Sequence, residues 1–295
     1  MVDCASANFV KSASRPRRSV CVAVGRVLLP VFAALLMSSC GVVNGIPRPE
    51  LHEVEARFSG LPEDMDGFRI ALVTDVHLND RDLSDYLSRI VDQVNLLAPD
   101  LVAITGDLVD GHAEGFAKRL GELRALNARY GVFAVPGNHE YCAGYREIAA
   151  SLSALGVTVL ENSHRMVRPG FAVAGVTDPA ALIYHLPGPD IAAALKDIPR
   201  GTFILLLAHR PALCVSAAEF GVNLQLSGHT HGGMIVGLDR LVADRNRGFA
   251  AGLYQVGGTT LYVSRGTAAK GPGWLGLPGR VGVPSEITLL ILRRG

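Results

Sequence analysis

Acidic, amide and imidazole side chains recur in this 295-residue sequence shortly after apolar runs that have the length of buried strands. Carboxylate, amide and imidazole donors in combination suit a divalent ion of intermediate softness, such as manganese, iron or zinc. Five such occurrences in one chain indicate a metal centre rather than five unrelated turns. The groups are Asp75 and His77, Asp107, Asn138 and His139, His209, and His229 and His231.

The spacing inside two of these motifs also suits metal binding. Asp75 and His77 are two residues apart, so on an extended segment both side chains would point the same way and reach one ion. His229 and His231 have the same spacing, and they either share one ion or divide between two. The carboxylate of Asp107 could bridge two ions. Glycines would allow sharp turns and leave room for a ligand at Gly106, Gly137 and Gly228.

The elements that must position these groups alternate along the chain. From Phe68 onward, apolar runs of strand length alternate with segments whose apolar residues recur at helical spacing, which predicts an α/β layered fold. Because the carboxyl ends of strands line one crevice in such folds, we expect the polar groups to converge there. Strands are expected at 69–74, 101–105, 132–135, 157–160, 171–176, 203–208 and 224–227, and helices at 83–97, 116–126, 145–155, 190–197 and 211–220.

The C-terminal part is richer in strands than the rest. Apolar runs at 253–256, 261–264 and 287–292 are separated by glycine-containing turns. This pattern suggests a second sheet.

The first 40 residues resemble a targeting segment. Residues 1–39 carry five basic side chains and one acidic side chain, and the apolar core Val27–Met37 is 11 residues long. That length is typical of a signal peptide and is too short to span a bilayer. The sequence Ser38-Ser39-Cys40 resembles a lipoprotein cleavage site, whereas the alternative is an uncleaved anchor over Val20–Met37.

Both alternatives place the catalytic body at a membrane, with the basic flank in the cytoplasm and the body on the extracytoplasmic face. We interpret residues 41–66 as a linker and lead-in, and residues 67–295 as the catalytic domain.

Charge and cysteine content exclude several classes of protein. The net charge is +1, so the chain beyond the basic first 39 residues carries about −3 and has no electrostatic footprint for nucleic acid. None of the five cysteines forms a CxxC pair, which argues against a zinc knuckle or a thioredoxin-like site.

The ordered motifs resemble the calcineurin-like metallophosphoesterase superfamily over about residues 66–295. They are Asp75-x-His77, Gly106-Asp107-x-x-Asp110, Gly137-Asn138-His139-Glu140, His209 and Gly228-His229-Thr230-His231. The segments 264–266 (Ser-Arg-Gly) and 284–287 (Pro-Ser-Glu-Ile) are similar to its membrane-associated YkuE/YaeI-type branch. Lys270–Leu277, with Trp274, departs from that branch. The resemblance implies a four-layer α/β/β/α sandwich of two mixed sheets flanked by helices.

The resemblance also implies a binuclear site for two divalent ions (manganese, iron or zinc), with a metal-activated hydroxide as the nucleophile. Its ligand sets would be Asp75, His77, Asp107 and His231 for one ion, and Asp107, Asn138, His209 and His229 for the other, with Asp107 as the bridge.

For several residues beside the ligands, more than one role is compatible with the sequence. His139, which is not a ligand in the family, would protonate the leaving oxygen or stabilise charge on the phosphoryl group. Asp110 or Glu140 either orients His139 or is a surface acid. Arg210 either contacts phosphate or is exposed to solvent.

The expected function is hydrolysis of a phosphodiester or pyrophosphate in a membrane lipid or cell-envelope substrate. One alternative is a UDP-2,3-diacylglucosamine-type pyrophosphatase of lipid A synthesis, although an extracytoplasmic body argues against that cytoplasmic step. A broad nucleotide phosphodiesterase would need stacking aromatic residues, for which Tyr184 and Trp274 are candidates. A catalytically silent metal-binding envelope protein is disfavoured because no ligand position is missing.

Overall fold

The computed structural model describes residues 48–78, 85–111, 119–268, 280 and 282–295. The predictions for the targeting segment 1–40, for Cys40 and for Lys270–Leu277 with Trp274 lie outside these residues. Within the described ranges, no helix combines the length and the apolar character that a bilayer crossing requires.

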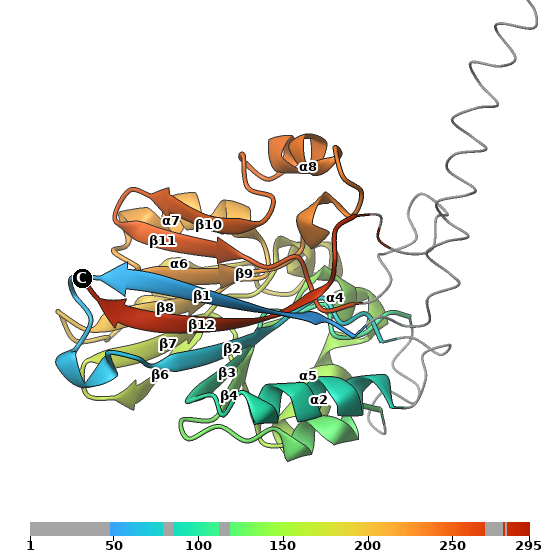
Figure 1. Cartoon of the computed structure of the whole chain (residues 1–295), viewed down its shortest axis with the longest axis horizontal. Coiled ribbons are helices and arrows are strands. Elements are labelled where there is room, and N and C mark those ends of the chain that lie inside the picture. The colour runs from blue at the N-terminus through green and yellow to red at the C-terminus, as the bar shows by residue number, and fades with distance from the viewer. Residues whose placement is uncertain (1–47, 79–84, 112–118, 269–279, 281) are drawn as a thin grey trace, which may run out of the picture.

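Two six-stranded mixed sheets pack face to face and carry helices on their outer faces, as the family resemblance implied (Figure 1). The first sheet has the order β1-β12-β2-β3-β4-β5 and the second β10-β11-β9-β8-β7-β6. The strands of the first sheet are β1 (Glu50–Phe58), β2 (Arg69–Val73), β3 (Leu101–Ile104), β4 (Val132–Ala134), β5 (Val157–Val159) and β12 (Glu286–Arg294). Those of the second are β6 (Ser163–Arg168), β7 (Phe171–Gly175), β8 (Phe203–Leu207), β9 (Leu224–Ser227), β10 (Gly252–Val256) and β11 (Thr259–Val263).

The strand-rich C-terminal part divides between the sheets, so only two of its three strands belong to the predicted second sheet. β10 and β11 pair with each other, and β11 pairs with β9. β12 instead enters the first sheet, parallel to β1 and antiparallel to β2. Its residues are almost all buried, which suits a strand with neighbours on both sides and a packed sheet face.

Three hydrophobic layers hold the sandwich together. The largest apolar side chains of the central layer come from both sheets and include Leu72, Phe171 and Phe203. A second cluster packs the outer face of the first sheet against α2 (Tyr86–Leu96) and α5 (Tyr145–Ala154). A third packs the outer face of the second sheet against α6 (Ile191–Leu195) and α7 (Cys214–Glu219). These layers fix which strand ends adjoin.

The helical elements agree with the sequence in position more than in type. The predicted helix at 116–126 is a 3₁₀ turn, η2 (Leu120–Ala125), over its described part, and the predicted helix at 211–220 is η4 (Pro211–Leu213) followed by α7. The sequence analysis did not predict α4 (Asn138–Ala143) or the half-exposed edge strand β6. The remaining elements are η1 (Glu63–Met65), η3 (Pro179–Tyr184), η5 (His231–Gly233) and α8 (Asp239–Arg245).

Parallel pairing brings the expected strand ends to one edge. β2, β3 and β4 are mutually parallel neighbours in the first sheet, and β7, β8 and β9 are parallel neighbours in the second. The two edges meet, since the His229 amide donates to the Asp75 carboxylate at 3.0 and 3.1 Å. The predicted crevice therefore forms between the sheets at the carboxyl ends of these strands.

Candidate active site

Seven of the eight side chains predicted for the site form three overlapping groups at this edge. In each group the donor atoms lie within 4.8 Å of one another. The groups are Asp75 with His77 and His231, His77 with Asp107 and His139, and Asp107 with His209 and His229. The eighth, Asn138, adjoins the last group, because its Oδ1 lies 3.2 Å from His209 Nε2.

Asp107 occupies the centre of the arrangement. Its Oδ2 lies 3.2 Å from His209 Nε2, 3.8 Å from His77 Nε2 and 3.9 Å from His139 Nε2. Its Oδ1 accepts a hydrogen bond from the His139 amide at 2.9 Å. One carboxylate thus faces imidazoles on both sides.

Two imidazole pairs meet nitrogen to nitrogen. His77 Nε2 lies 3.1 Å from His231 Nε2, and His209 Nε2 lies 3.1 Å from His229 Nδ1. In each pair only one nitrogen can carry the proton of the contact, so the other must point a lone pair at it. Such nitrogens next to buried carboxylates fit divalent metal ions in place of the shared protons.

The carboxylates and imidazoles of the site shift one another's pKa. Burial alone would raise the pKa of Asp75 and Asp107, but the neighbouring imidazoles hold the pKa of both carboxyl groups well below the usual range. Burial alone would lower the pKa of His209, but Asp107 and Asp75 raise it to about 10. Its pair partner His229 is shifted the opposite way, because burial and then the charge of His209 lower its pKa to about 4.

The pKa values of the other imidazole pair, His77 and His231, are also shifted in opposite directions. Burial would lower the pKa of His77, but hydrogen bonds to Asp110 and Asp75 raise it above the ordinary value. Burial lowers the pKa of His231 to about 3. Each pair therefore combines one imidazole whose pKa is raised with one whose pKa is lowered.

The two acids with open roles, Asp110 and Glu140, have different partners, and Glu140 is not a surface acid. Asp110 Oδ1 lies 2.6 Å from His139 Nδ1 and 2.8 Å from His77 Nδ1, so Asp110 orients His139. Glu140 is buried and accepts hydrogen bonds from the amides of Asp107, Leu108 and Gly137 at 2.9, 2.7 and 2.7 Å. Glu140 thereby ties the turn after β3 to the turn that begins α4.

The backbone at the site is not extended, contrary to the geometry expected for the two motifs. Asp75, His77, His229 and His231 have φ values of 52°, 50°, 70° and 51°, in the left-handed region. Such conformations are strained for residues other than glycine and cluster at functional sites. As a result His231 turns toward Asp75 and His77, whereas His229 turns toward His209 and Asp107.

The three predicted glycines are required by close approach. A Cβ at Gly106 would lie 2.2 Å from the Gly137 nitrogen, and one at Gly137 would lie 2.2 Å from Asp107 Oδ1. A Cβ at Gly228 would lie 2.1 Å from Asp75 Oδ2. Gly106 and Gly137 thus let the turns after β3 and β4 of the first sheet approach each other, and Gly228 lets the end of β9 in the second sheet approach Asp75.

Arginines flank the site on two sides. The Arg210 Nε donates to Asp178 Oδ2 at 2.8 Å, and the Arg210 side chain is 32% exposed, so it is neither free in solvent nor fully buried. The sequence analysis missed the buried Asp178, which has no motif of its own. It also missed Arg280, whose Nη1 donates to the His231 carbonyl at 3.2 Å and whose Nε donates to the Ala268 carbonyl at 2.9 Å.

Comparison with known proteins gives a consistent assignment. The calcineurin-like phosphoesterase family matches residues 68–233. The chain is 35% identical over 272 residues to an uncharacterised metallophosphoesterase of Campylobacter jejuni, covering 90% of this chain and 68% of that protein. It is 34% identical to a transmembrane protein with metallophosphoesterase domain from Danio rerio, covering 91% of this chain and 63% of that one.

A third relative belongs to the branch named by the sequence motifs. The metallophosphoesterase YkuE of Bacillus subtilis is 32% identical over 255 residues, covering 83% of this chain and 85% of that protein. The chain therefore belongs to the calcineurin-like phosphoesterases, hydrolases that use a binuclear divalent metal centre.

Proposed function

We propose that this enzyme hydrolyses phosphodiester or pyrophosphate bonds of a cell-envelope substrate at the membrane surface. The observation that carries the proposal is the position of Asp107 Oδ2 between two imidazole groups, which suits a carboxylate shared by two cations. Two bound ions would supply the Lewis acidity that lowers the pKa of water and the charge that offsets the phosphoryl oxygens.

The chain offers two ligand sets around that carboxylate. We assign Asp75, His77, Asp107 and His231 to one ion, and Asp107, Asn138, His209 and His229 to the other. The grouping of donor atoms and the two imidazole contacts support this division. Thr105 holds His209 in place, because its carbonyl oxygen lies 2.7 Å from His209 Nδ1 and leaves Nε2 facing Asp107.

His139 is assigned as the group that protonates the leaving oxygen. Its side chain is 32% exposed, whereas that of His77 is 4% exposed, so substrate can reach His139. The Asp110 carboxylate at Nδ1 stabilises the protonated ring and aims Nε2 into the site. Arg210 lies where it could contact a phosphoryl oxygen, held by Asp178.

The membrane location rests on the sequence. The apolar run Val27–Met37 and the following Cys40 support either a lipidated or an anchored N-terminus. A relative carries the name of a transmembrane protein with a metallophosphoesterase domain. A body held at the membrane surface meets envelope intermediates at high local concentration, which favours them as substrates.

The direct test is hydrolysis of bis-p-nitrophenyl phosphate by the full chain with added manganese. We expect metal-dependent release of nitrophenol that falls at least about 100-fold in Asp107→Ala and in His139→Ala. Manganese content measured on the purified proteins should fall in Asp107→Ala and stay near the wild-type value in His139→Ala.

A matched control is Asp92→Ala, which removes an exposed carboxylate on α2. This variant should behave as the wild type. If the wild-type protein bound manganese but did not hydrolyse the diester, the proposed diesterase activity would be contradicted. If it bound no manganese, the assignment of the metal ligands would be contradicted.

A further inference from the structure

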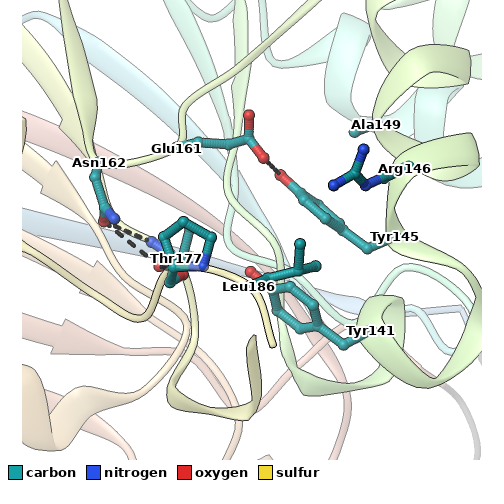
Figure 2. Close-up of a pocket in the computed structure, with 9 residues that line it drawn as sticks. Tyr141, Tyr145, Arg146, Ala149, Glu161, Asn162, Thr177 and Leu186 are labelled. Carbon is teal, nitrogen blue, oxygen red and sulfur yellow. Dashed lines mark hydrogen bonds between the residues drawn. The ribbon is translucent and has the colours of Figure 1, made fainter. Parts of the chain in front are cut away.

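A cavity of about 530 Å³ lies between α4, α5 and the loop after η3. Figure 2 shows Tyr141 and Tyr145 extending into it from the helices, with Asn162 and Thr177 on the facing wall. Its volume falls within the range of small-molecule sites. The predicted active-site motifs contribute no side chain to it.

Two residues of its lining are close in sequence to residues of the candidate active site. Tyr141 follows Asn138 by three residues on α4, which places it about 4.5 Å further along the helix axis and about 300° around it, on nearly the same face. On the other wall, Thr177 precedes Asp178, the residue that holds Arg210 beside His209. A phosphoester bound at the metal centre would therefore have this cavity next to its organic group.

Three polar groups of the cavity have unused hydrogen-bonding capacity. Tyr141 is 4% exposed, and its hydroxyl, which faces the Asp178 backbone, has no acceptor for its own proton among the described residues. Glu161 uses one carboxylate oxygen to accept the Tyr145 hydroxyl at 2.5 Å, and the described part of the chain provides no hydrogen bond to its other oxygen. The exposed Arg146 guanidinium likewise has no ion-pair partner in the described ranges. A buried hydroxyl without a partner is unfavourable unless a ligand or water satisfies it.

This lining disfavours two kinds of ligand. An acyl chain would cover the Tyr141 hydroxyl, Glu161 and Arg146 without replacing their hydrogen bonds to water. A nucleobase would need an open ring face, but one side of Tyr141 packs on Tyr145 at 4.8 Å between ring centroids and it also stacks on Tyr184 at 6.3 Å. Tyr141 therefore offers its hydroxyl rather than a face.

We propose that this cavity, lined by Tyr141, Tyr145, Arg146 and Glu161, binds the sugar of a sugar-phosphate substrate. A sugar hydroxyl can donate to the Glu161 carboxylate and accept from Tyr141 and Arg146. Hydroxyl groups alone can therefore satisfy both the hydrogen-bond acceptor and the hydrogen-bond donors of the cavity. The apolar side chains Leu186 and Pro187 on the wall suit the C–H faces of the ring. The sugar is either the pentose of a nucleotide or a hexose of a glycosyl phosphate. The inference rests on the proposed phosphoester hydrolysis at the adjoining centre.

Isothermal titration calorimetry of the full chain with manganese tests the cavity without relying on turnover. The probes are glucose 6-phosphate, ribose 5-phosphate, n-hexyl phosphate and inorganic phosphate. We expect at least one sugar phosphate to bind about tenfold or more tightly than hexyl phosphate, which has the same charge and a similar size. The stronger of the two sugar phosphates identifies the pentose or the hexose as the preferred class.

Variants assign the preference to the cavity. Tyr141→Phe, which removes only the hydroxyl, should reduce the preference for sugar phosphate over hexyl phosphate by about threefold to tenfold, as expected for one hydrogen bond. Glu161→Gln, at an exposed position, should reduce it as well and serves if the tyrosine variant fails to fold. Arg200→Ala, an exposed arginine on the loop before β8 at the other end of that strand from His209, is the matched control.

Equal binding of all three organic phosphates, or tighter binding of hexyl phosphate, would overturn the proposal, as would a sugar preference that survives in both cavity variants. These outcomes are distinct from failure of the proposed function. Hydrolysis of bis-p-nitrophenyl phosphate without a sugar preference would leave the diesterase intact and remove only the sugar site.

Discussion

Asp110 Oδ1 lies 2.6 Å from Nδ1 of His139, the proposed proton donor. The same oxygen lies 2.8 Å from Nδ1 of His77, a proposed metal ligand. One carboxylate oxygen thus orients two imidazoles with different tasks, so that the Nε2 atoms of both rings face Asp107. Groups that orient ligands in this way influence both metal affinity and activity.

Asp110→Ala should lower both turnover and metal affinity, because His77 and His139 lose their common partner. We expect activity on bis-p-nitrophenyl phosphate at saturating manganese to fall about 10- to 100-fold. Manganese titration should show weaker binding than in the wild type. Asp92→Ala is the control, and wild-type kinetics in Asp110→Ala would contradict the orienting role.

Gly228→Ala should disrupt the meeting of the two sheets. The added Cβ would lie 2.1 Å from Asp75 Oδ2 and 2.2 Å from Thr74 Oγ1, so the turn before His229 must shift. We expect loss of manganese binding, measured by metal analysis after gel filtration. Gly258→Ala, where a Cβ meets nothing within 4 Å, should bind manganese normally. Normal metal content in both variants would show that the turn is not needed at its present position.

Glu140→Gln should destabilise the fold as well as the site. The carboxylate accepts three backbone N–H groups, and the amide of glutamine would place its own N–H groups against one or more of them. We expect the free energy of unfolding to fall by about 1–3 kcal/mol in urea titrations. The exposed Glu122→Gln should change it by less than about 0.5 kcal/mol. If Glu140→Gln lost no more free energy of unfolding than Glu122→Gln, that result would argue against the structural role of Glu140.

Glu286 should make stability depend on acidic pH. Burial would raise its pKa, but the hydrogen bond and charge of Arg265, together with the Tyr262 hydroxyl, lower the pKa below the ordinary 4.5. A lowered folded-state pKa adds stability that is complete above the unfolded-state pKa and is lost as pH falls through the folded-state value. The unfolding free energy of the wild type should therefore decline below about pH 4.5 more steeply than that of Glu286→Gln. Parallel declines of the two proteins in urea titrations across this range would contradict the prediction.

Manganese should stabilise the folded protein, because its ligands converge only after folding. At a free concentration 100 times the dissociation constant, each site contributes about 2.7 kcal/mol to the free energy of unfolding. Thermal unfolding with manganese and with excess chelator measures the difference. In His209→Ala the stabilisation should shrink, because one imidazole pair is lost. An unchanged midpoint in the wild type would count against metal binding at this site.

The strands that carry the site could be predicted from local patterns, but their partners could not. The runs at β2, β3, β4 and β8 are almost continuously apolar, so their positions are visible in the sequence. β12 has the same kind of pattern, yet it joins the first sheet rather than the second. Pairing depends on contacts between segments more than 200 residues apart, such as Leu72 with Thr288, which no local pattern reports.

Short elements at the site were missed for a related reason. α4 has six residues, and the buried Glu140 in its first turn bonds to the turn after β3. A helix of this length has too few residues to show a period. Its existence depends on partners supplied by another strand.

The sequence by itself determined the donor types, their order along the chain and the alternation of strands and helices, because these depend on residue identity and local spacing. The resemblance implied the two ligand sets, but only the tertiary structure showed the contacts that group His231 with Asp75 and His229 with His209. It also showed that one Asp110 oxygen orients two imidazoles and that Tyr141 opens onto a cavity. Those relationships depend on how the ends of two separate sheets approach each other. The approach is set by side-chain packing between the sheets and by glycines with no room for a Cβ.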